Sequence, residues 1–379
     1  MTGAMYAAVS GMKAHMNKLN VIGNNVSNVN TYGYKSARTT FTESLYTSMR
    51  GGSNGSASMG GVNPAQFGYG STISTIDLDM STKSYVPTGR AMDCALSGDG
   101  FFMVGTKSEI VTEDGGTDYN LNPKSAQDLM LTRVGDFTFD SQGYLTDGRG
   151  NVVYGFVTCA NGDTAGEPSE EPGTGSTDDF LVSTQLVPIR LPLAAVGSGT
   201  AGDADYVPEG AAIYPGVTDG LNVYSSDPTL TTGKPIACNL ESITIDGTTG
   251  KITGYNNATE TAVVIGYIPL AKVTNPYGVT HASGPYYRAG EGAGECTVAA
   301  VGGALGSVYL DNKKAGDAGA VSIFSTGSVV INTSGLEASG TDLATEFSDM
   351  ISTQRGYQAN TRIITVTDAM LEELVNIKR

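Results

Sequence analysis

Two histidines, His15 and His281, are the side chains in this 379-residue sequence with the widest range of possible chemistry. A single histidine cannot hold zinc, and no cysteine or second histidine is spaced to complete a zinc site around either one. A nucleophilic serine needs Gly-x-Ser-x-Gly at a sharp turn between a strand and a helix. The one match, at residues 51–55, lies in a Gly- and Ser-rich stretch (51–61) that predicts a flexible linker. We expect no catalytic residue and no enzyme, with a Ser-His-Asp triad around His281 as the alternative.

Two other patterns are predicted to bind nothing. The glycine-rich residues 290–294 lack the lysine and the helix start that a phosphate-binding loop needs. The acidic pairs Asp77/Asp79 and Asp178/Asp179 lack the spaced acids and distal glutamate of a calcium loop, so we interpret them as solvent-facing. We therefore expect no metal and no cofactor.

The composition narrows the class of protein. A formal net charge of −16 argues against a nucleic-acid or anionic-membrane surface. The 51 glycines and the absence of tryptophan favour a turn-rich β protein with helices in only part of the chain. No run of about 18 apolar residues occurs, and the short apolar run 5–9 leads us to expect no signal peptide. The cysteines, which we expect to be small buried apolar residues, are Cys94, Cys159, Cys238 and Cys296.

An amphipathic helix is predicted over the first thirty residues. Its apolar residues recur at alternating steps of four and three, which is the spacing of a heptad seam. Residues 23–34 are rich in Asn, Ser and Gly, and they predict fraying because such side chains compete for backbone hydrogen bonds. The seam residues that we expect to pack subunits together are Met5, Val9, Met12, Met16, Leu19 and Val26.

A second, longer helix is predicted from Asp342 to Arg379. Residues 339–342 offer several capping oxygens, and Asp342 and Glu346 at its start match the helix dipole. Its apolar residues also recur with a period of seven. The subunit-packing residues expected here are Leu343, Phe347, Met350, Tyr357, Ile364, Leu371 and Leu374.

These helices stand at the two ends of a β-rich middle. Two helices packed only on each other leave apolar surface exposed, and copies of the same chain are the simplest cover for it. The middle is predicted to hold strands at 75–80, 137–146 and 152–156, with an echo of the second segment at 243–253. We expect an α+β fold of paired coiled-coil terminal helices around one or two β domains. The expected parts are a helical domain (1–30 and 342–379), a connecting region (31–72 and 326–341), a β domain (73–157 and 239–325) and an inserted, solvent-facing outer segment (158–238).

Several segments together resemble the bacterial flagellar rod and hook family. Residues 21–36 resemble its N-terminal signature, 95–104 and 131–145 its β-domain signatures, and 334–339, 350–360 and 370–379 its C-terminal end. The residues that carry the terminal signatures are Gly23, Asn24, Asn25, Asn28, Gly33, Lys35, Gln354, Arg355, Tyr357 and Asn360.

The resemblance implies a structural subunit that self-assembles into a hollow helical tube. Within the family the sequence is most similar to the hook, the flexible joint that transmits motor torque, because rod proteins are shorter and residues 33–36 have the hook form. It further implies export by the flagellar type III apparatus, an extracellular location in the hook or basal body, and contacts with rod, hook-cap and hook–filament junction proteins. The alternatives are a distal rod subunit and, from another class, a secreted β-rich adhesin suggested by the adjacent Tyr286 and Tyr287.

Overall fold

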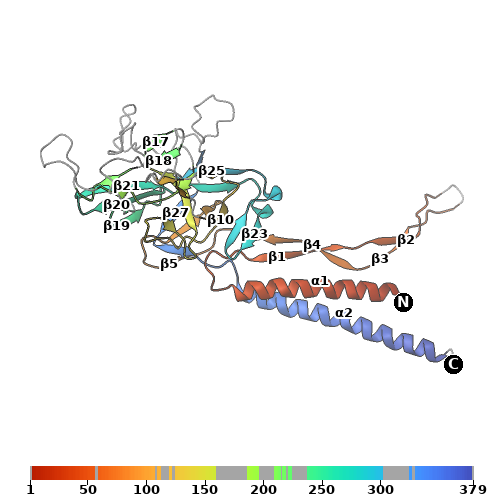
Figure 1. Ribbon diagram of the computed structural model, residues 1–379. Coiled ribbons are helices and arrows are strands. Elements are labelled where there is room, and N and C mark those ends of the chain that lie inside the picture. Colours follow the sequence, from red (N-terminus) through yellow and green to blue (C-terminus); the bar gives the residue numbers. More distant parts are fainter. Residues whose placement is uncertain are drawn as a thin grey trace. The chain divides into compact units, whose positions relative to one another are not determined.

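The computed structural model describes residues 2–55, 59–106, 109–111, 119–121, 124–158, 186–195, 209–214, 216–218, 221–223, 237–301, 324–326 and 329–377. One helix at each end and strands between them confirm the predicted α+β class (Figure 1). The chain divides into two compact units. The first combines Met1–Asp79 with Ser339–Arg379, and the second is Met80–Ala338.

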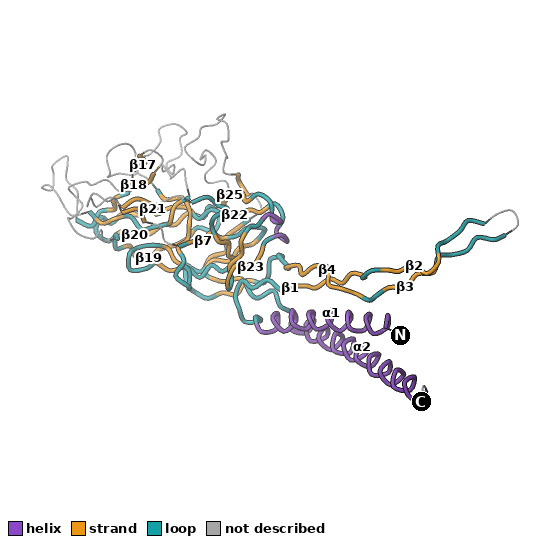
Figure 2. The backbone as a smooth tube through the Cα atoms, turned by 45° about the vertical axis from the view of Figure 1, so that its right-hand side comes forward, coloured by secondary structure: helices purple, strands orange, loops and turns teal. Residues whose placement is uncertain are grey.

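The first unit contains the helices α1 (Thr2–Ser27) and α2 (Leu343–Ile377) and a long two-stranded ribbon. The ribbon pairs β1 (Ala37–Glu43) with β4 (Ser71–Leu78), and β2 (Tyr46–Arg50) with β3 (Ala65–Gly68), all antiparallel. Thr and Ile residues in β1 and β4 favour the extended backbone. Figure 2 shows the two helices side by side and the ribbon running along α1. Gly70, at φ +105°, lies so close to Ala7 of α1 that a β-carbon there would be 3.0 Å from the Ala7 backbone.

This arrangement corrects the expected boundaries at the start of the chain. Residues 37–78 are not a connecting region followed by the β domain, because they form the ribbon of the helical unit. The described part of 51–61 joins two strands of one hairpin, with a bridge between Ser53 and Val62, and does not link two domains. The helix α1 also continues through residues 23–27, where fraying was expected, and ends at Ser27.

The second unit is built on one large, mostly antiparallel sheet. Its main path follows the order β19-β20-β21-β13-β7-β10-β24-β23. These strands are β19 (Leu240–Ile245), β20 (Lys251–Asn256), β21 (Thr261–Tyr267), β13 (Val152–Val157), β7 (Phe102–Gly105), β10 (Met130–Thr132), β24 (Tyr286–Arg288) and β23 (Thr280–Ser283). Strands β11 (Thr138–Phe139), β12 (Leu145–Thr146) and β14 (Val187–Pro188) attach beside this path.

Smaller sheets and two short 3-10 helices complete the described part of the second unit. The sheets are β22 (Leu270–Val273) with β25 (Cys296–Val301) and β26 (Phe324–Thr326); β15 (Leu193–Ala194) with β16 (Ala212–Ile213); β17 (Gly216–Thr218), β18 (Leu221–Val223), β9 (Tyr119–Leu121) and β8 (Glu109–Val111); β27 (Val330–Thr333) with β6 (Cys94–Ser97); and β28 (Gly335–Glu337) with β5 (Tyr85–Pro87). The 3-10 helices are Pro276–Gly278 and Glu291–Ala293. Strands β27 and β28 therefore belong to the second unit, which corrects the expected connecting region 326–341.

The predicted strand segments of the middle are confirmed. Residues 137–146 form β11 and β12, 152–156 lie in β13, and the echo at 243–253 is the β19–β20 hairpin. In both hairpins an aspartate closes the turn. Asp140 Oδ1 accepts hydrogen bonds from Gln142 N and Tyr144 N, and Asp246 Oδ1 accepts one from Thr248 N.

The core of the second unit is mainly apolar. The rings of Phe102 and Phe137 meet edge to face with centroids 5.0 Å apart, and neither side chain is accessible to solvent. Cys94, Cys238 and Cys296 are buried, as expected, and burial raises the pKa of the Cys94 thiol to about 12. Cys159 lies outside the described residues.

The expected solvent-facing segment 158–238 is corrected where it is described. Residues 186–195 are buried except for Ala194, and Leu193 and Ile213 join one hydrophobic cluster with Val157. The apolar residues of that stretch extend the core, because β14 pairs with β13 of the main sheet. Most of the rest of 158–238, including Asp178 and Asp179, lies outside the described residues.

Candidate assembly surface

The first unit has almost no hydrophobic core. Among its described residues, the buried apolar side chains are Ala8, Ala14, Ile22 and Leu78. A domain of this length normally gains its stability by burying far more apolar surface. The first unit taken alone is therefore poorly stabilised by burial.

Small and polar residues form much of the contact between α1 and α2. A β-carbon at Gly11 would lie 2.8 Å from Asn360 Nδ2, and one at Gly356 would lie 2.7 Å from His15 Cε1. The helices run antiparallel, since rising positions in α1 meet falling positions in α2. In α2 only Thr353 and Thr367 are buried among the described residues, and both hydroxyls donate to carbonyls four residues back in the same helix. Two glycines thus set the close approach of the helices.

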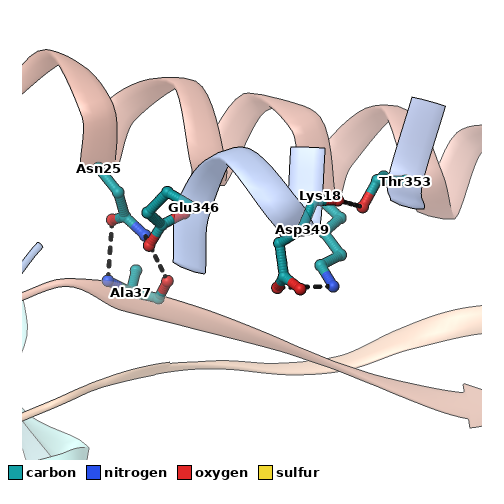
Figure 3. Close-up of polar contacts among 6 residues, drawn as sticks. All are labelled: Lys18, Asn25, Ala37, Glu346, Asp349 and Thr353. Atoms are coloured by element: carbon teal, nitrogen blue, oxygen red, sulfur yellow. Dashed lines mark hydrogen bonds and ion pairs between the residues drawn. The ribbon is translucent and has the colours of Figure 1, made fainter. Parts of the chain in front are cut away.

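Two polar contacts fasten this seam (Figure 3). Lys18 Nζ lies 3.1 Å from Asp349 Oδ2, and Asn25 Nδ2 donates to Glu346 Oε1 at 2.8 Å. The exposure of Asp349 limits the free energy of the ion pair to a small contribution. Burial raises the pKa of the Glu346 carboxyl, although the Asn25 hydrogen bond opposes that shift.

Asn25 is a buried junction for three elements. Its side chain is 1% exposed, and it exchanges two hydrogen bonds with the Ala37 backbone: Nδ2 donates to Ala37 O at 2.9 Å, and Oδ1 accepts from Ala37 N at 3.0 Å. The Tyr34 hydroxyl also donates to Oδ1 at 3.0 Å. With the bond to Glu346, this amide fixes the end of α1 against the beginnings of β1 and α2 (Figure 3).

The residues that precede α2 are hydrogen-bonded to the same end of α1. Thr341 Oγ1 donates to Asn25 O at 3.1 Å, and Ser339 Oγ donates to Asn28 O at 2.9 Å. Asp342 caps α2 as predicted, because its carboxylate accepts from Ala344 N at 3.0 Å. The hydrogen bond from Thr345 Oγ1 and, second, the one from Ala344 N lower the pKa of Asp342.

These contacts give a structural reason for most of the N-terminal signature residues. Asn24 donates to Tyr34, Asn28 donates to Asn24 O, Gly33 adopts φ +67°, and Lys35 is fully buried. Gln354 and Arg355 of the C-terminal signature are exposed on α2, whereas Asn360 lies in the seam.

None of the expected subunit-packing residues is buried within the chain. Seven are at least 36% exposed: Val9, Met16, Leu343, Phe347, Tyr357, Leu371 and Leu374. The half-buried ones are Met5, Met12, Leu19, Val26, Met350 and Ile364. Met12 reaches α2 within the chain, because Thr361 Oγ1 donates to its Sδ at 3.5 Å. Much of the apolar stripe is left exposed, and its role in packing subunits together stays a prediction.

The exposed apolar surface is concentrated in the first unit. Further members are Ile351, Val366, Val375 and Ile377 of α2, and Leu45, Met49, Met59 and Phe67 of the ribbon region. In the described part of the second unit, the exposed large apolar side chains are Tyr85, Tyr255, Tyr277 and Val330. A surface of this kind marks a site of protein–protein contact.

The serine and the histidine considered for chemistry belong to different units, Ser53 to the first and His281 to the second. The His281 ring lies 4.5 Å from the ring of Tyr287, and Tyr286 and Tyr287 are both buried. Ser53 lies in the ribbon and not on an elbow before a helix. Within the described ranges, no group of three or more His, Cys, Asp or Glu side chains is placed to hold a metal ion, and no helix has the length and apolar character of a membrane span.

Comparison with known proteins places these features in one family. A family described as "Flagellar basal body rod FlgEFG protein C-terminal" matches residues 333–377, and "Flagella basal body rod protein" matches residues 5–35. The chain is 30% identical to the flagellar basal-body rod protein FlgG of Bacillus subtilis over 100% of both chains. It is 24% identical to the flagellar hook protein FlgE of Borreliella burgdorferi over 100% of both, and 29% identical to that of Rhizobium meliloti over 100% of this chain and 99% of the relative.

The chain belongs to the family of flagellar basal-body rod and hook proteins. Its relatives are structural components of the bacterial flagellum, and the family is not one of enzymes. The two family matches fall on α1 with the segment that follows it and on β28 with α2, so they cover the junction around Asn25.

Proposed function

We propose that this chain is a subunit of the flagellar hook. It self-assembles through its first unit into a hollow helical tube that acts as a flexible joint and transmits motor torque to the filament. The observation that carries this proposal is the pairing of an almost coreless first unit with an outward apolar stripe on both helices. Copies of the same chain would bury that stripe, and a head-to-tail contact that does not close on itself builds a helical polymer.

In this proposal the terminal helices form a coiled coil in the inner wall, and the β-rich second unit is carried outside. The helices gain their full order on assembly, which couples folding to polymerisation. The subunit reaches the bacterial flagellum by type III export and is extracellular once assembled. Its partners are further copies of itself, the rod, hook-cap and hook–filament junction proteins, and the export apparatus.

A distal rod subunit is the second candidate, and one observation favours it. The Bacillus subtilis rod protein aligns over 379 positions, so it carries no insertion relative to this chain, whereas the hook protein alignments that cover the whole chain extend over 446 to 474 positions. Several hook proteins nevertheless align with the whole chain, which supports the hook. The adhesin alternative loses its main support because Tyr286 and Tyr287 are core residues.

Electron microscopy of the concentrated purified protein tests the proposal. Long curved tubes are the expected result, and short straight segments would favour the rod. A protein lacking residues 2–27 and 343–379 is the control, and it should stay monomeric. Full-length protein that remains monodisperse at every concentration would contradict assembly through the first unit.

A further inference from the structure

Two sequence signatures, 131–145 and 334–339, lie in the second unit, apart from Ser339, which is hydrogen-bonded to the end of α1. They lie about 200 positions apart in the chain, yet both contribute a buried charge to the same place in the second unit. That place is where the chain enters and leaves this unit, at Met80 and Ala338.

The entering and leaving segments are paired with each other. β5 and β28 form a two-stranded antiparallel sheet with the register Gly335↔Pro87, Leu336↔Val86 and Glu337↔Tyr85. Ala338 N donates to Ser84 O at 2.9 Å, and Thr88 N donates to Ser334 O at 3.0 Å. Strands of three residues specify their register weakly by backbone pairing alone.

The Glu337 carboxylate joins three segments at this point. Glu337 itself lies on the leaving strand, and its Oε1 accepts from Lys83 N of the entering segment at 2.9 Å. Its Oε2 lies 3.8 Å from Nη1 of Arg133, which directly follows β10 of the main sheet. Both charged side chains are 1% exposed, and the Arg133 guanidinium also lies 5.2 Å from the Phe101 ring centroid.

We infer that Glu337 and Arg133 form a register lock that fixes both chain connections of the second unit to its main sheet. A slip of β28 by one residue would turn Glu337 to the opposite face and leave Arg133 as a buried charge without this counter-ion. Burial already lowers the pKa of Arg133, and the Glu337 charge opposes that shift, which is the electrostatic sign of a compensated pair.

The mechanical consequence rests on the proposed function. In a torque-carrying subunit, a force on the terminal helices reaches the second unit through the two connections at Met80 and Ala338. The lock transfers that force to the main sheet at Arg133 instead of leaving it on three backbone pairs.

Hydrogen exchange on the full-length protein tests the lock. Arg133→Met should speed exchange of the amides at 84–88 and 335–338 by about tenfold, while the β13 amides keep their protection. Arg190→Met is the matched control, since Arg190 is also buried over an aromatic ring, 4.8 Å from the Tyr144 centroid, and its Nε donates to Gln142 O. If Arg133→Met does not fold, Glu337→Gln gives the same comparison, because its amide oxygen still accepts from Lys83 N.

Two results would overturn the lock. One is uniform acceleration across the second unit in the Arg133→Met or Glu337→Gln protein. The other is full protection of the two connections in the doubly neutral Arg133→Met/Glu337→Gln protein. Torsional stiffness of assembled tubes, expected to fall in the Glu337→Gln protein, tests the mechanical consequence separately. Failure of the wild-type protein to form tubes would count against the proposed function and leave the exchange result intact.

Discussion

Gly11 of α1 lies directly against the Asn360 amide of α2, with no room for a β-carbon between them. This relationship sets how closely the helices approach, and it decides which faces of the pair are hidden inside the chain and which are left for neighbours. Small and polar side chains make much of the helix contact, together with Met12, and many of the long apolar side chains stay exposed.

Gly11→Leu should separate the helices. The added side chain would overlap the Asn360 amide, and displacing that amide would break its hydrogen bond to Gly356 O, so we expect a loss of about 1–3 kcal/mol in the stability of the helix pair. Circular dichroism during thermal unfolding measures this loss. Gly23→Ala is the control, because a β-carbon at this position of α1 would meet open space among the described residues and should improve helix propensity. An equal loss of stability in the Gly11→Leu and Gly23→Ala proteins would contradict the role of Gly11 in the contact between α1 and α2.

Asn25→Ala should loosen the junction between α1, β1 and α2. The substitution removes four side-chain hydrogen bonds and leaves the Ala37 amide and carbonyl without this partner, which costs about 1–3 kcal/mol. Faster hydrogen exchange at Ala37 and easier proteolysis of residues 28–36 are the expected readouts. Asn24→Ala, at an exposed neighbouring position, should change neither by a comparable amount.

Leu371→Asp should block assembly while the monomer stays folded. Leu371 is 36% exposed in the single chain, so the charge is tolerated there, whereas burial of an unpaired carboxylate between subunits is strongly unfavourable. Sedimentation velocity and electron microscopy compare the variant with wild type. Thr365→Asp adds the same charge at an exposed polar position of α2 and should still assemble. Tubes of normal length from Leu371→Asp would refute the packing role.

Acidification should weaken the helix seam through His15. Burial and, second, the charge of Lys18 lower the pKa of His15 below its usual 6.5. Protonation of His15 is therefore harder in the folded protein than in the unfolded chain. The stability that neutral His15 contributes is complete above pH 6.5 and declines as the pH falls below that value. The pH dependence that Glu346 contributes to stability has the opposite sign and falls in a more acidic range. The pKa of Glu346 is raised above 4.5, so its protonation stabilises the folded protein by removing a buried charge.

His15→Gln should make the stability of the helix seam depend less on pH between about pH 7 and about pH 5. The measurement is hydrogen exchange of the α1 amides at several pH values, corrected for intrinsic exchange rates. Parallel pH dependence in the wild-type and His15→Gln proteins would show that another group is responsible.

Much of the fold follows from local sequence patterns, and the seam shows where such patterns mislead. The helices, the strand segments 137–156 and the 243–253 hairpin are set by periodicity and turn chemistry that neighbouring residues determine. In α1, however, two heptad series lie one position apart. The apolar series is half-buried or exposed, and the series that makes most of the seam contains Ala8, Gly11, His15, Lys18, Ile22 and Asn25.

A search for apolar residues selects the first series, although the second has equally regular spacing. The small and polar residues of α2 at 346, 349, 353, 356 and 360 have the same spacing, and this matched pair of series is the signal that could have located the seam.

The ribbon was not predicted for a different reason. Its Gly- and Ser-rich tip is typical of a linker, and only the long-range pairing of β1 with β4 shows that the chain doubles back.

The pairing of β5 with β28 has one more consequence. Since the second unit begins and ends on adjacent strands, residues added to its surface loops leave the separation of its two attachment points unchanged. We therefore expect relatives to differ in bulk within this unit more than in the terminal framework. Alignments of hook relatives with this chain reach 474 positions, against its 379 residues.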